Sequence, residues 1–202
     1  IDGLTAKGID ILWGDIVNPS EEWVESLSQA DYVYHLAGAR VGLHKRDFFK
    51  VNVDGTRNLL NICKEKNSGL KRFVFVSSAT VCGPSQPGSQ QTEETNNPQT
   101  PYAESKYAAE RMALEEYGSI LPITIIRPTA IYGPRTTEFT ALIEMVVRWR
   151  RRPIVGLFSD CVVNLCHVED LVTGMILAAK NDKAIGETFV LGGSEQSWDE
   201  MG

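Results

Sequence analysis

The residues best suited to chemistry are Tyr102 and Lys106, in the stretch Pro101-Tyr-Ala-Glu-Ser-Lys-Tyr107. Its alanine, glutamate and lysine content favours a helix, and residues four apart lie on one face of a helix. A lysine ammonium beside a tyrosine stabilises the phenolate and lowers the pKa of the phenol. Tyr102 would then move a proton near neutral pH rather than near the unperturbed pKa of about 10. The alternative is a surface Tyr/Lys pair on an ordinary amphipathic helix, and the spacing alone does not exclude it.

Composition limits the class of protein. The chain has 202 residues, of which 43% are hydrophobic and 23% charged, and this suits one α/β domain with a sizeable core. A net charge of −6 argues against a nucleic-acid surface, and the basic run at 148–152 is interpreted as cations at a helix C-terminus. No apolar run reaches the roughly 18 residues that span a membrane, and no signal-peptide layout is present. The four scattered cysteines form no metal-ligand pairs and indicate reduced thiols in a cytoplasmic protein.

Strands and helices alternate along the chain. Strands are expected at 9–13, 31–36, 71–76, 121–127, 154–157, 162–165 and 188–191, and helices at 21–30, 47–66, 101–117, 139–151 and 168–180. This alternation predicts a parallel sheet with helices on both faces. In such sheets ligands gather outside the carboxyl ends of the strands. Ala37-Gly38, Ser77-Ser78 and Pro128-Thr129 each follow a strand directly, so we expect them to share one crevice with Tyr102. A polar stretch at 83–100 is expected to be a loop that acts as a lid.

Short motifs in a fixed order give these residues a context. They are Gly14-Asp15-Ile16, His35-Leu36-Ala37-Gly38, Asn52-Val53-Asp54-Gly55-Thr56, Ser77-Ser78-Ala79-Thr80-Val81, Tyr102-x-x-x-Lys106, Arg127-Pro128, Tyr132-Gly133-Pro134 and His167-Val168-Glu169-Asp170-Leu171. With them the chain resembles the extended short-chain dehydrogenase/reductase superfamily, in its NAD-dependent epimerase/dehydratase family and 3β-hydroxysteroid-dehydrogenase-like branch. The resemblance implies a Rossmann-like doubly wound parallel sheet. It also implies an NAD(P)-dependent oxidoreductase that transfers hydride at a secondary alcohol or ketone.

The resemblance gives each matching residue a role. Tyr102 would be the catalytic acid/base, and Lys106 would hold the nicotinamide ribose and depress the Tyr102 pKa. Ser78 would hydrogen-bond the reacting oxygen, with Thr80 as a second hydroxyl beside the substrate. Asn52 would pin two strands together. No metal is implied. The residues implied at the cofactor, NAD or NADP with NAD favoured, are Asp15, Ile16, Leu36, Ala37, Gly38, Ala39, Arg40, Val51, Tyr102, Lys106, Pro128 and Thr129.

Some of these residues also have a purely structural interpretation. Asp15 could end a strand in an Asx turn, and Ser77-Ser78 could be a polar strand terminus. His35 is interpreted as a packed strand histidine. His167 is interpreted as a cap of the last helix.

The sequence departs from the family pattern in two respects. The family begins with a strand, a Gly-rich phosphate turn and a helix, and this N-terminal βαβ unit is missing here. The 202-residue chain alone is therefore expected to be inactive, with negligible cofactor affinity. In nucleotide-sugar members an Asn and an Arg hold the diphosphate of the substrate. The matching residues here are Ala130 and Val163, which favours a less polar substrate.

We expect residues 1–135 to form a partial dinucleotide-binding domain and residues 136–202 a partial substrate-binding region interleaved with the last strands. Two other functions stay open. One is a nucleotide-sugar epimerase or dehydratase with an altered clamp. The other is a non-catalytic dinucleotide-sensing or interaction protein. The expected partner is a small-molecule substrate, with no nucleic acid and no membrane. The resemblance also allows a homodimer through the helices at 47–66 and 101–117.

Overall fold

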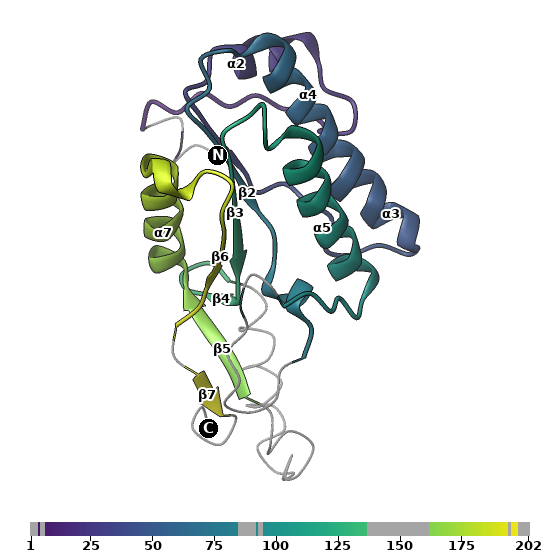
Figure 1. The fold of residues 1–202 in the computed structure, drawn as a ribbon, viewed down its shortest axis with the longest axis vertical. Helices are drawn as coiled ribbons and strands as arrows, with labels where there is room; N and C mark the ends of the chain where they lie inside the picture. Colours follow the sequence, from purple (N-terminus) through teal and green to yellow (C-terminus); the bar gives the residue numbers. More distant parts are fainter. Residues whose placement is uncertain are drawn as a thin grey trace.

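The main sheet has four parallel strands in the order β1-β2-β3-β6 (Figure 1). The computed structural model describes Leu4, residues 7–84, Thr92 and residues 95–136, 162–193 and 195–197. In the register of the central strands, Phe73 of β2 lies opposite Val33 of β1 and Ile123 of β3. The strands are β1 (Tyr32–His35), β2 (Arg72–Val76), β3 (Ile123–Pro128) and β6 (Thr188–Leu191).

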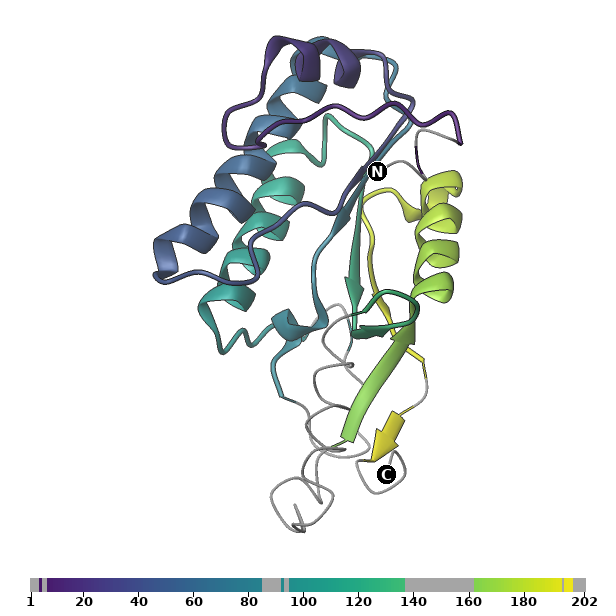
Figure 2. The same ribbon diagram turned by 180° about the vertical axis from the view of Figure 1, so that it is seen from behind.

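Helices cover both faces of this sheet. α2 (Glu21–Ser28), α4 (Thr56–Lys66) and α5 (Pro101–Met112) lie on one face, and α7 (Val168–Lys180) lies on the other (Figures 1 and 2). The expected doubly wound parallel sheet is thus confirmed. No helix in the described part of the chain is both long and apolar enough to cross a membrane.

The core has two parts because successive strand residues point to opposite faces. Phe73 and Phe75 of β2 are fully buried in a cluster beneath α4 and α5. Val74, between them, packs in a second cluster with Leu171 and Met175 of α7. All six residues of β3 are buried, as expected for an inner strand covered on both faces.

A second, smaller sheet continues beyond the carboxyl end of β3 (Figure 1). It contains β4 (Ala130–Tyr132), β5 (Val162–His167) and β7 (Glu195–Ser197), with β4 and β5 parallel and β5 and β7 antiparallel. α7 follows β5 directly, and His167 caps it by accepting a hydrogen bond from the Glu169 backbone N–H at 3.3 Å. The capping interpretation of His167 is therefore confirmed. The elements expected at 139–151 and 154–157, with the basic run at 148–152, lie outside the described residues, and the domain division at 135 stays a prediction.

The strand expected at 9–13 is wrong. These residues join no ladder, and the nearest pairing is an isolated bridge between Asp15 and Asn18. An extended segment becomes a strand only when its backbone groups pair with a neighbour, and apolar content alone does not provide one.

The helix expected at 47–66 is not a regular α-helix. It begins as α3 (Lys45–Phe49), passes through a π-helical segment, η1 (Lys50–Gly55), and continues as α4. The helix expected at 101–117 also changes to a π-helical segment, η3 (Ala113–Tyr117). Its start agrees with the expectation, because the Thr100 side chain accepts from the Ala103 N–H at 3.2 Å and Pro101 is the first helical residue.

Candidate active site

The predicted catalytic residues come from two elements that meet at the carboxyl end of β2. Tyr102 and Lys106 lie in the first two turns of α5, and Ser78 lies two residues beyond Val76, where β2 ends. Ser78 is also the N-cap of a short 3-10 helix, η2 (Ala79–Cys82). Ser78 thus lies at the polar terminus of β2, as its structural interpretation expects, and on the same side of the sheet end as the start of α5.

Ser78 lies near enough to Tyr102 for its side chain to act on the phenol. Burial raises the pKa of the Tyr102 phenol above its usual value, whereas the Ser78 side chain and the positive charge of Arg40 act to lower it. Arg40 belongs to the loop that follows β1. Phe48 of α3 makes an edge contact with the Tyr102 ring, with 6.4 Å between ring centroids. Three separate elements thus define the surroundings of the phenol.

Lys106 is 3% exposed and turns its ammonium toward β2. Its Nζ donates a hydrogen bond to the Val76 carbonyl oxygen at 2.7 Å and lies 4.3 Å from the centroid of the Phe75 ring. Burial lowers the pKa of Lys106 to about 8, and the nearby Glu110 carboxylate opposes that shift. The groups that act to lower the Tyr102 pKa in this structure are Ser78 and Arg40, and the Lys106 ammonium is directed at the end of β2. The lowering of the Tyr102 pKa by Lys106 stays a prediction.

Asn52 connects the loop after β1 to the start of α5. Its Oδ1 accepts from the Ala39 N–H at 2.7 Å, and its Nδ2 donates to the Ala39 carbonyl at 3.1 Å. The same Nδ2 donates to Ser105 Oγ at 2.8 Å, and the Ser105 hydroxyl donates to the Tyr102 carbonyl at 2.7 Å. Asn52 therefore pins a loop to a helix and not two strands to each other. Ser105 was missed in the sequence, although it lies within the Tyr-x-x-x-Lys stretch.

Gly38 allows the loop after β1 to approach the site closely. A side-chain carbon at this position would lie 3.0 Å from Asn52 Oδ1 and 3.7 Å from Lys106 Nζ. Only a residue without a side chain leaves this backbone free of a tight contact with Asn52. The structure thus brings Gly38 and Ala39 close to Lys106 and Asn52, beside the helix that carries Tyr102.

Glu110 and Arg127 form a buried ion pair that the sequence analysis also missed. The guanidinium donates to both carboxylate oxygens, at 2.9 Å from Nε and 2.6 Å from Nη2, and each side chain is 3% exposed. Arg127 also donates to Asn96 Oδ1 at 2.7 Å and to the Thr95 carbonyl at 3.4 Å. The pair therefore fixes the end of the 83–100 loop to β3 and α5. The available signal was that Glu110 follows Lys106 by four residues and so shares its helix face.

His35 is a buried, neutral histidine. Its Nε2 lies 2.8 Å from Thr56 Oγ1, and because the Thr56 hydroxyl donates to the Asn52 carbonyl at 2.6 Å, Nε2 is the donor. Burial, with a smaller effect of the Lys106 charge, lowers the pKa of His35 to about 3. The ring stacks on Phe75, with 5.4 Å between centroids. The interpretation as a packed strand histidine is confirmed.

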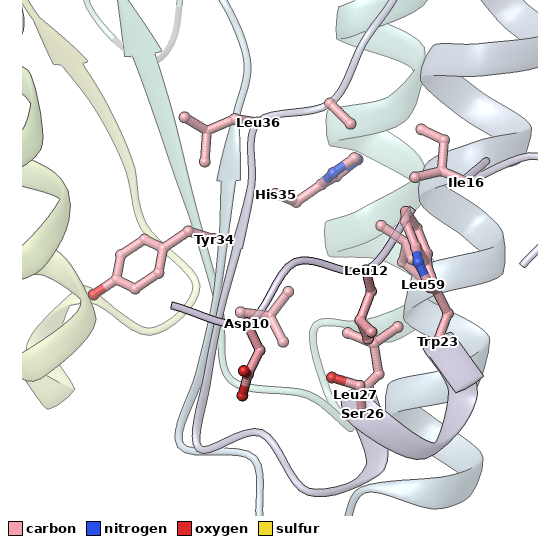
Figure 3. A pocket seen from close by; sticks show the side chains of 12 residues that line it. Asp10, Leu12, Ile16, Trp23, Ser26, Leu27, Tyr34, His35, Leu36 and Leu59 are labelled. Atoms are coloured by element: carbon pink, nitrogen blue, oxygen red, sulfur yellow. The ribbon is translucent and has the colours of Figure 1, made fainter. Parts of the chain in front are cut away.

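Some residues predicted at the cofactor line a cavity of about 340 Å³ beside β1 (Figure 3). Ile16, Leu36 and Ala37 contribute to it, together with the apolar side chains of Leu12 and Trp23. In Figure 3, Tyr34 and His35 point to opposite sides of β1, and His35 faces the helices. Ser78, Tyr102 and Lys106 do not line this cavity.

The remaining predicted residues are held by local contacts. The Asp15 carboxylate accepts from the Val17 N–H at 2.9 Å, which is the Asx-turn alternative, and Ile16 is 6% exposed in the core. Thr129 donates to Asn164 Oδ1 at 3.2 Å, next to the buried Pro128. Val51 is half-buried in η1. In the described ranges, no group of three or more His, Cys, Asp or Glu residues is arranged to hold a metal ion.

Comparison with known proteins agrees with this geometry. The family model of the NAD dependent epimerase/dehydratase family matches residues 3–192. The chain belongs to this family. Residues 14–171, which carry the motifs of the sequence analysis, all fall within the matched range. The matched range includes the parallel sheet and Ser78 at the end of β2.

Within the family, similarity extends to proteins with different substrates. A 3 beta-hydroxysteroid dehydrogenase/Delta 5-->4-isomerase of Mycobacterium tuberculosis is 33% identical over 184 residues, which are 85% of this chain and 49% of that protein. An uncharacterized UDP-glucose epimerase of Bacillus subtilis is 27% identical over 181 residues, which are 85% of this chain and 56% of that protein. The chain spans about half the length of the curated relatives it matches.

A solved structure supports the fold independently. The dTDP-glucose 4,6-dehydratase of Bacillus anthracis, in complex with NAD, is 26% identical with a TM-score of 0.73. The match covers 91% of this chain and 59% of that one. The sheet and its helices thus superpose on an NAD-bound member of the family.

Proposed function

We propose that the protein is an NAD(P)-dependent oxidoreductase that transfers hydride at a secondary alcohol or ketone, with Ser78, Tyr102 and Lys106 as its active set. The observation that supports this most is that Ser78, at the carboxyl end of β2, acts on the Tyr102 phenol at the start of α5. Ligands gather at this edge of a parallel α/β sheet. The family match to residues 3–192 supports the same assignment.

The chemistry follows from what the two hydroxyls can do. An alcohol that loses hydride must also lose a proton, and Tyr102 is placed to accept it as a general base. In the reverse direction, Ser78 and Tyr102 together donate hydrogen bonds to the oxygen on which negative charge develops. Burial raises the Tyr102 pKa, and the positive charge of Arg40 opposes that shift by favouring the phenolate. The ammonium of Lys106, fixed at the end of β2, would hold the nicotinamide ribose.

The residues present fit a nicotinamide dinucleotide, and we propose NAD in preference to NADP. Gly38 lets the backbone approach Lys106 and Asn52, and Leu36, Ala37 and Ile16 line the cavity beside β1. When bound, the dinucleotide supplies the hydride acceptor or donor. Asp15, Ala39, Arg40, Val51, Pro128 and Thr129 complete the proposed contact set. The 202-residue chain alone, which has no Gly-rich phosphate turn, should show negligible affinity for NAD by calorimetry, and micromolar binding would contradict this.

The catalytic assignment is tested by one conservative change. In the full-length protein, Tyr102→Phe removes the phenolic proton and keeps the ring, so turnover of a 3β-hydroxysteroid with NAD or NADP should fall about 100-fold or more. Tyr107→Phe, one residue beyond Lys106 on the same helix, is the matched control and should keep its activity. Turnover that is unchanged in Tyr102→Phe would exclude the assignment and would favour a protein that binds dinucleotide without catalysis.

The second candidate is a nucleotide-sugar epimerase or dehydratase, favoured by the similarity to a UDP-glucose epimerase and a dTDP-glucose dehydratase. The two positions that would hold the substrate diphosphate, Ala130 and Val163, lie on the adjacent strands β4 and β5. An alanine and a valine there offer phosphate no side-chain charge or hydrogen bond. A melting-temperature shift with a 3β-hydroxysteroid and none with UDP-glucose would support the dehydrogenase. The opposite pattern would reverse the order.

The proposal extends to the substrate, the parts of the chain, the oligomeric state and the cellular location. We propose a small-molecule substrate, residues 1–135 as the dinucleotide-binding part and residues 136–202 as the substrate-binding part. A homodimer through the 47–66 and 101–117 helices is also proposed, and light scattering of the purified protein tests it. The described cysteines Cys63, Cys82 and Cys166 are free thiols, which is consistent with the cytoplasmic location that we propose.

A further inference from the structure

Ser78 receives two hydrogen bonds from the same neighbouring residue. Thr80 Oγ1 donates to Ser78 Oγ at 2.9 Å, and the Thr80 backbone N–H donates to the same oxygen at 3.3 Å. Both bonds arise because Ser78 caps η2, which places the second residue of the 3-10 turn over the serine side chain. The Val81 N–H also bonds the Ser78 carbonyl at 3.1 Å, so the turn is closed around Ser78.

This arrangement restricts what the Ser78 hydroxyl can do. A serine hydroxyl has two acceptor lone pairs and one proton. When Thr80 fills both acceptor positions, the proton is the part of the hydroxyl that remains for another partner. The Ser78 side chain acts to lower the pKa of the Tyr102 phenol, as expected when a hydrogen-bond donor lies near the phenolate oxygen.

We propose that Thr80 is a positioning residue that fixes Ser78 as a hydrogen-bond donor toward Tyr102 and the reacting oxygen of the substrate. The inference rests on the proposed function, because a fixed donor assists only where an oxygen gains negative charge. It also changes the role that the family resemblance implied for Thr80. The Thr80 proton is used on Ser78, so the substrate meets the serine hydroxyl and not that of the threonine.

The surroundings make this role testable without substrate. Thr80 is exposed, whereas Ser78 and Tyr102 are half-buried, so a change at Thr80 leaves the core intact. The charged group that acts on Tyr102 from another element is Arg40, and Phe48 adds an uncharged ring edge. We therefore expect a substitution at Thr80 to reach Tyr102 through Ser78.

The test is an ultraviolet titration of tyrosinate in the purified full-length protein, with Tyr102 identified by subtracting the Tyr102→Phe curve. Thr80→Val keeps the branched shape but removes the donor, so Ser78 can rotate away from the phenol. The Tyr102 midpoint should then rise by about 0.5 pH unit, part of the effect of one hydrogen bond to a charged group. Thr80→Ser keeps a hydroxyl and should restore the midpoint. An unchanged midpoint in Thr80→Val, or equal shifts in both variants, would overturn the proposal.

A double-mutant cycle separates the indirect role from a direct one. In a Ser78→Ala background, Thr80→Val should produce no further shift of the Tyr102 midpoint, because the residue it acts through is gone. The same shift with and without Ser78 would show that Thr80 acts on Tyr102 directly and would refute the proposal. The titration needs no turnover, so it tests the role of Thr80 even in an inactive protein. Inactivity on every alcohol tested would contradict the proposed function and would not affect the titration result. If the protein is active, Thr80→Val should lower kcat about fivefold with little change in KM.

Discussion

Asn52 Nδ2 donates a hydrogen bond to Ser105 Oγ at 2.8 Å, joining the π-helical segment η1 to α5, the helix that carries Tyr102. Both side chains are almost completely buried, at 1% and 0% exposure. The other bonds of Asn52 go to both backbone groups of Ala39. One amide thus sets the distance between the loop after β1 and the helix that carries Tyr102.

Replacing this amide should loosen the loop. Asn52→Ala removes the partner of the N–H and C=O of the half-buried Ala39, which should lower the free energy of unfolding by about 1–3 kcal/mol in a urea titration. Ser105→Ala keeps both Ala39 bonds and should cost less. Hydrogen exchange at the Ala39 amide should accelerate in Asn52→Ala but not in Ser105→Ala. Equal losses of stability in the two variants would show that the contact with Ala39 is not the main one.

The buried pair of Glu110 and Arg127 should behave differently from an exposed pair. Glu110→Gln leaves the Arg127 charge buried without a counter-ion, and this should cost about 3–5 kcal/mol of unfolding free energy. The double variant Glu110→Leu/Arg127→Met removes both charges, so it should cost clearly less than the sum of its single changes.

The matched control is the exposed i,i+4 pair of Arg111 and Glu115 on the surface of α5 and η3. Glu115→Gln should change the unfolding free energy by about 0–1 kcal/mol. Additive costs at Glu110 and Arg127, or a large cost at Glu115, would contradict the assignment of the buried pair as a unit.

Because of His35, the free energy of unfolding should decrease on mild acidification. Burial lowers its folded-state pKa to about 3 from the usual 6.5, so the unfolded chain binds a proton first as the pH falls. Unfolding free energy should therefore decrease as the pH falls from 6.5 toward 3, by at most about 1.4 kcal/mol per unit from this group. His35→Gln, which retains an N–H donor for Thr56, should flatten that slope. His44→Gln, at an exposed position, serves as the control, and an equal slope in His35→Gln would disprove the contribution.

Lys106 should make the free energy of unfolding depend on pH at alkaline values. Its folded-state pKa of about 8 lies below the usual 10.5, so between these values the unfolded chain holds a proton that the folded chain has released. Stability from this group should therefore increase as the pH rises from 8 to 10.5 and stay constant below 8. Lys106→Met removes the buried charge, so it should be more stable than the wild type at neutral pH, with a gap that narrows above pH 8.

The same variant separates stability from function. Lys106→Met should lose activity in the full-length protein even though its unfolding free energy is higher, whereas Lys66→Met at the exposed end of α4 should keep both activity and the pH slope. A Lys106→Met protein that is less stable at neutral pH would show that the Val76 hydrogen bond outweighs the cost of burial.

Local sequence signals were sufficient for much of this structure. Thr100 and Pro101 predict the start of α5 correctly, because an N-cap and a proline at the first helical position depend only on neighbouring residues. The strands at β2, β3 and β6 follow from continuous apolar runs, and the small residues after them locate the crevice. The family motifs then suggested roles for Ser78, Tyr102 and Lys106 that agree with their common location.

The partners of these side chains could not be predicted in the same way. Lys106 faces Val76, and Asn52 faces Ala39, because of how helices and strands register after folding, and no local pattern encodes that register. The absence of a strand at 9–13 has the same origin, since a strand depends on a neighbour. Ile16 illustrates a further difficulty, because a residue expected at a cofactor can also be a core residue packed against Gly55.

The wide turn at η1 has a consequence for how this region tolerates change in chain length. A π-helical turn contains one residue more than the α-helical turn it replaces, and each residue of an α-helix advances the side chains by about 100°. Deleting one residue within Lys50–Gly55 would therefore leave a continuous, regular helix while rotating Phe48 away from Tyr102. A helix that looks intact would have lost its alignment with the site. In this segment the number of residues matters as much as their identity.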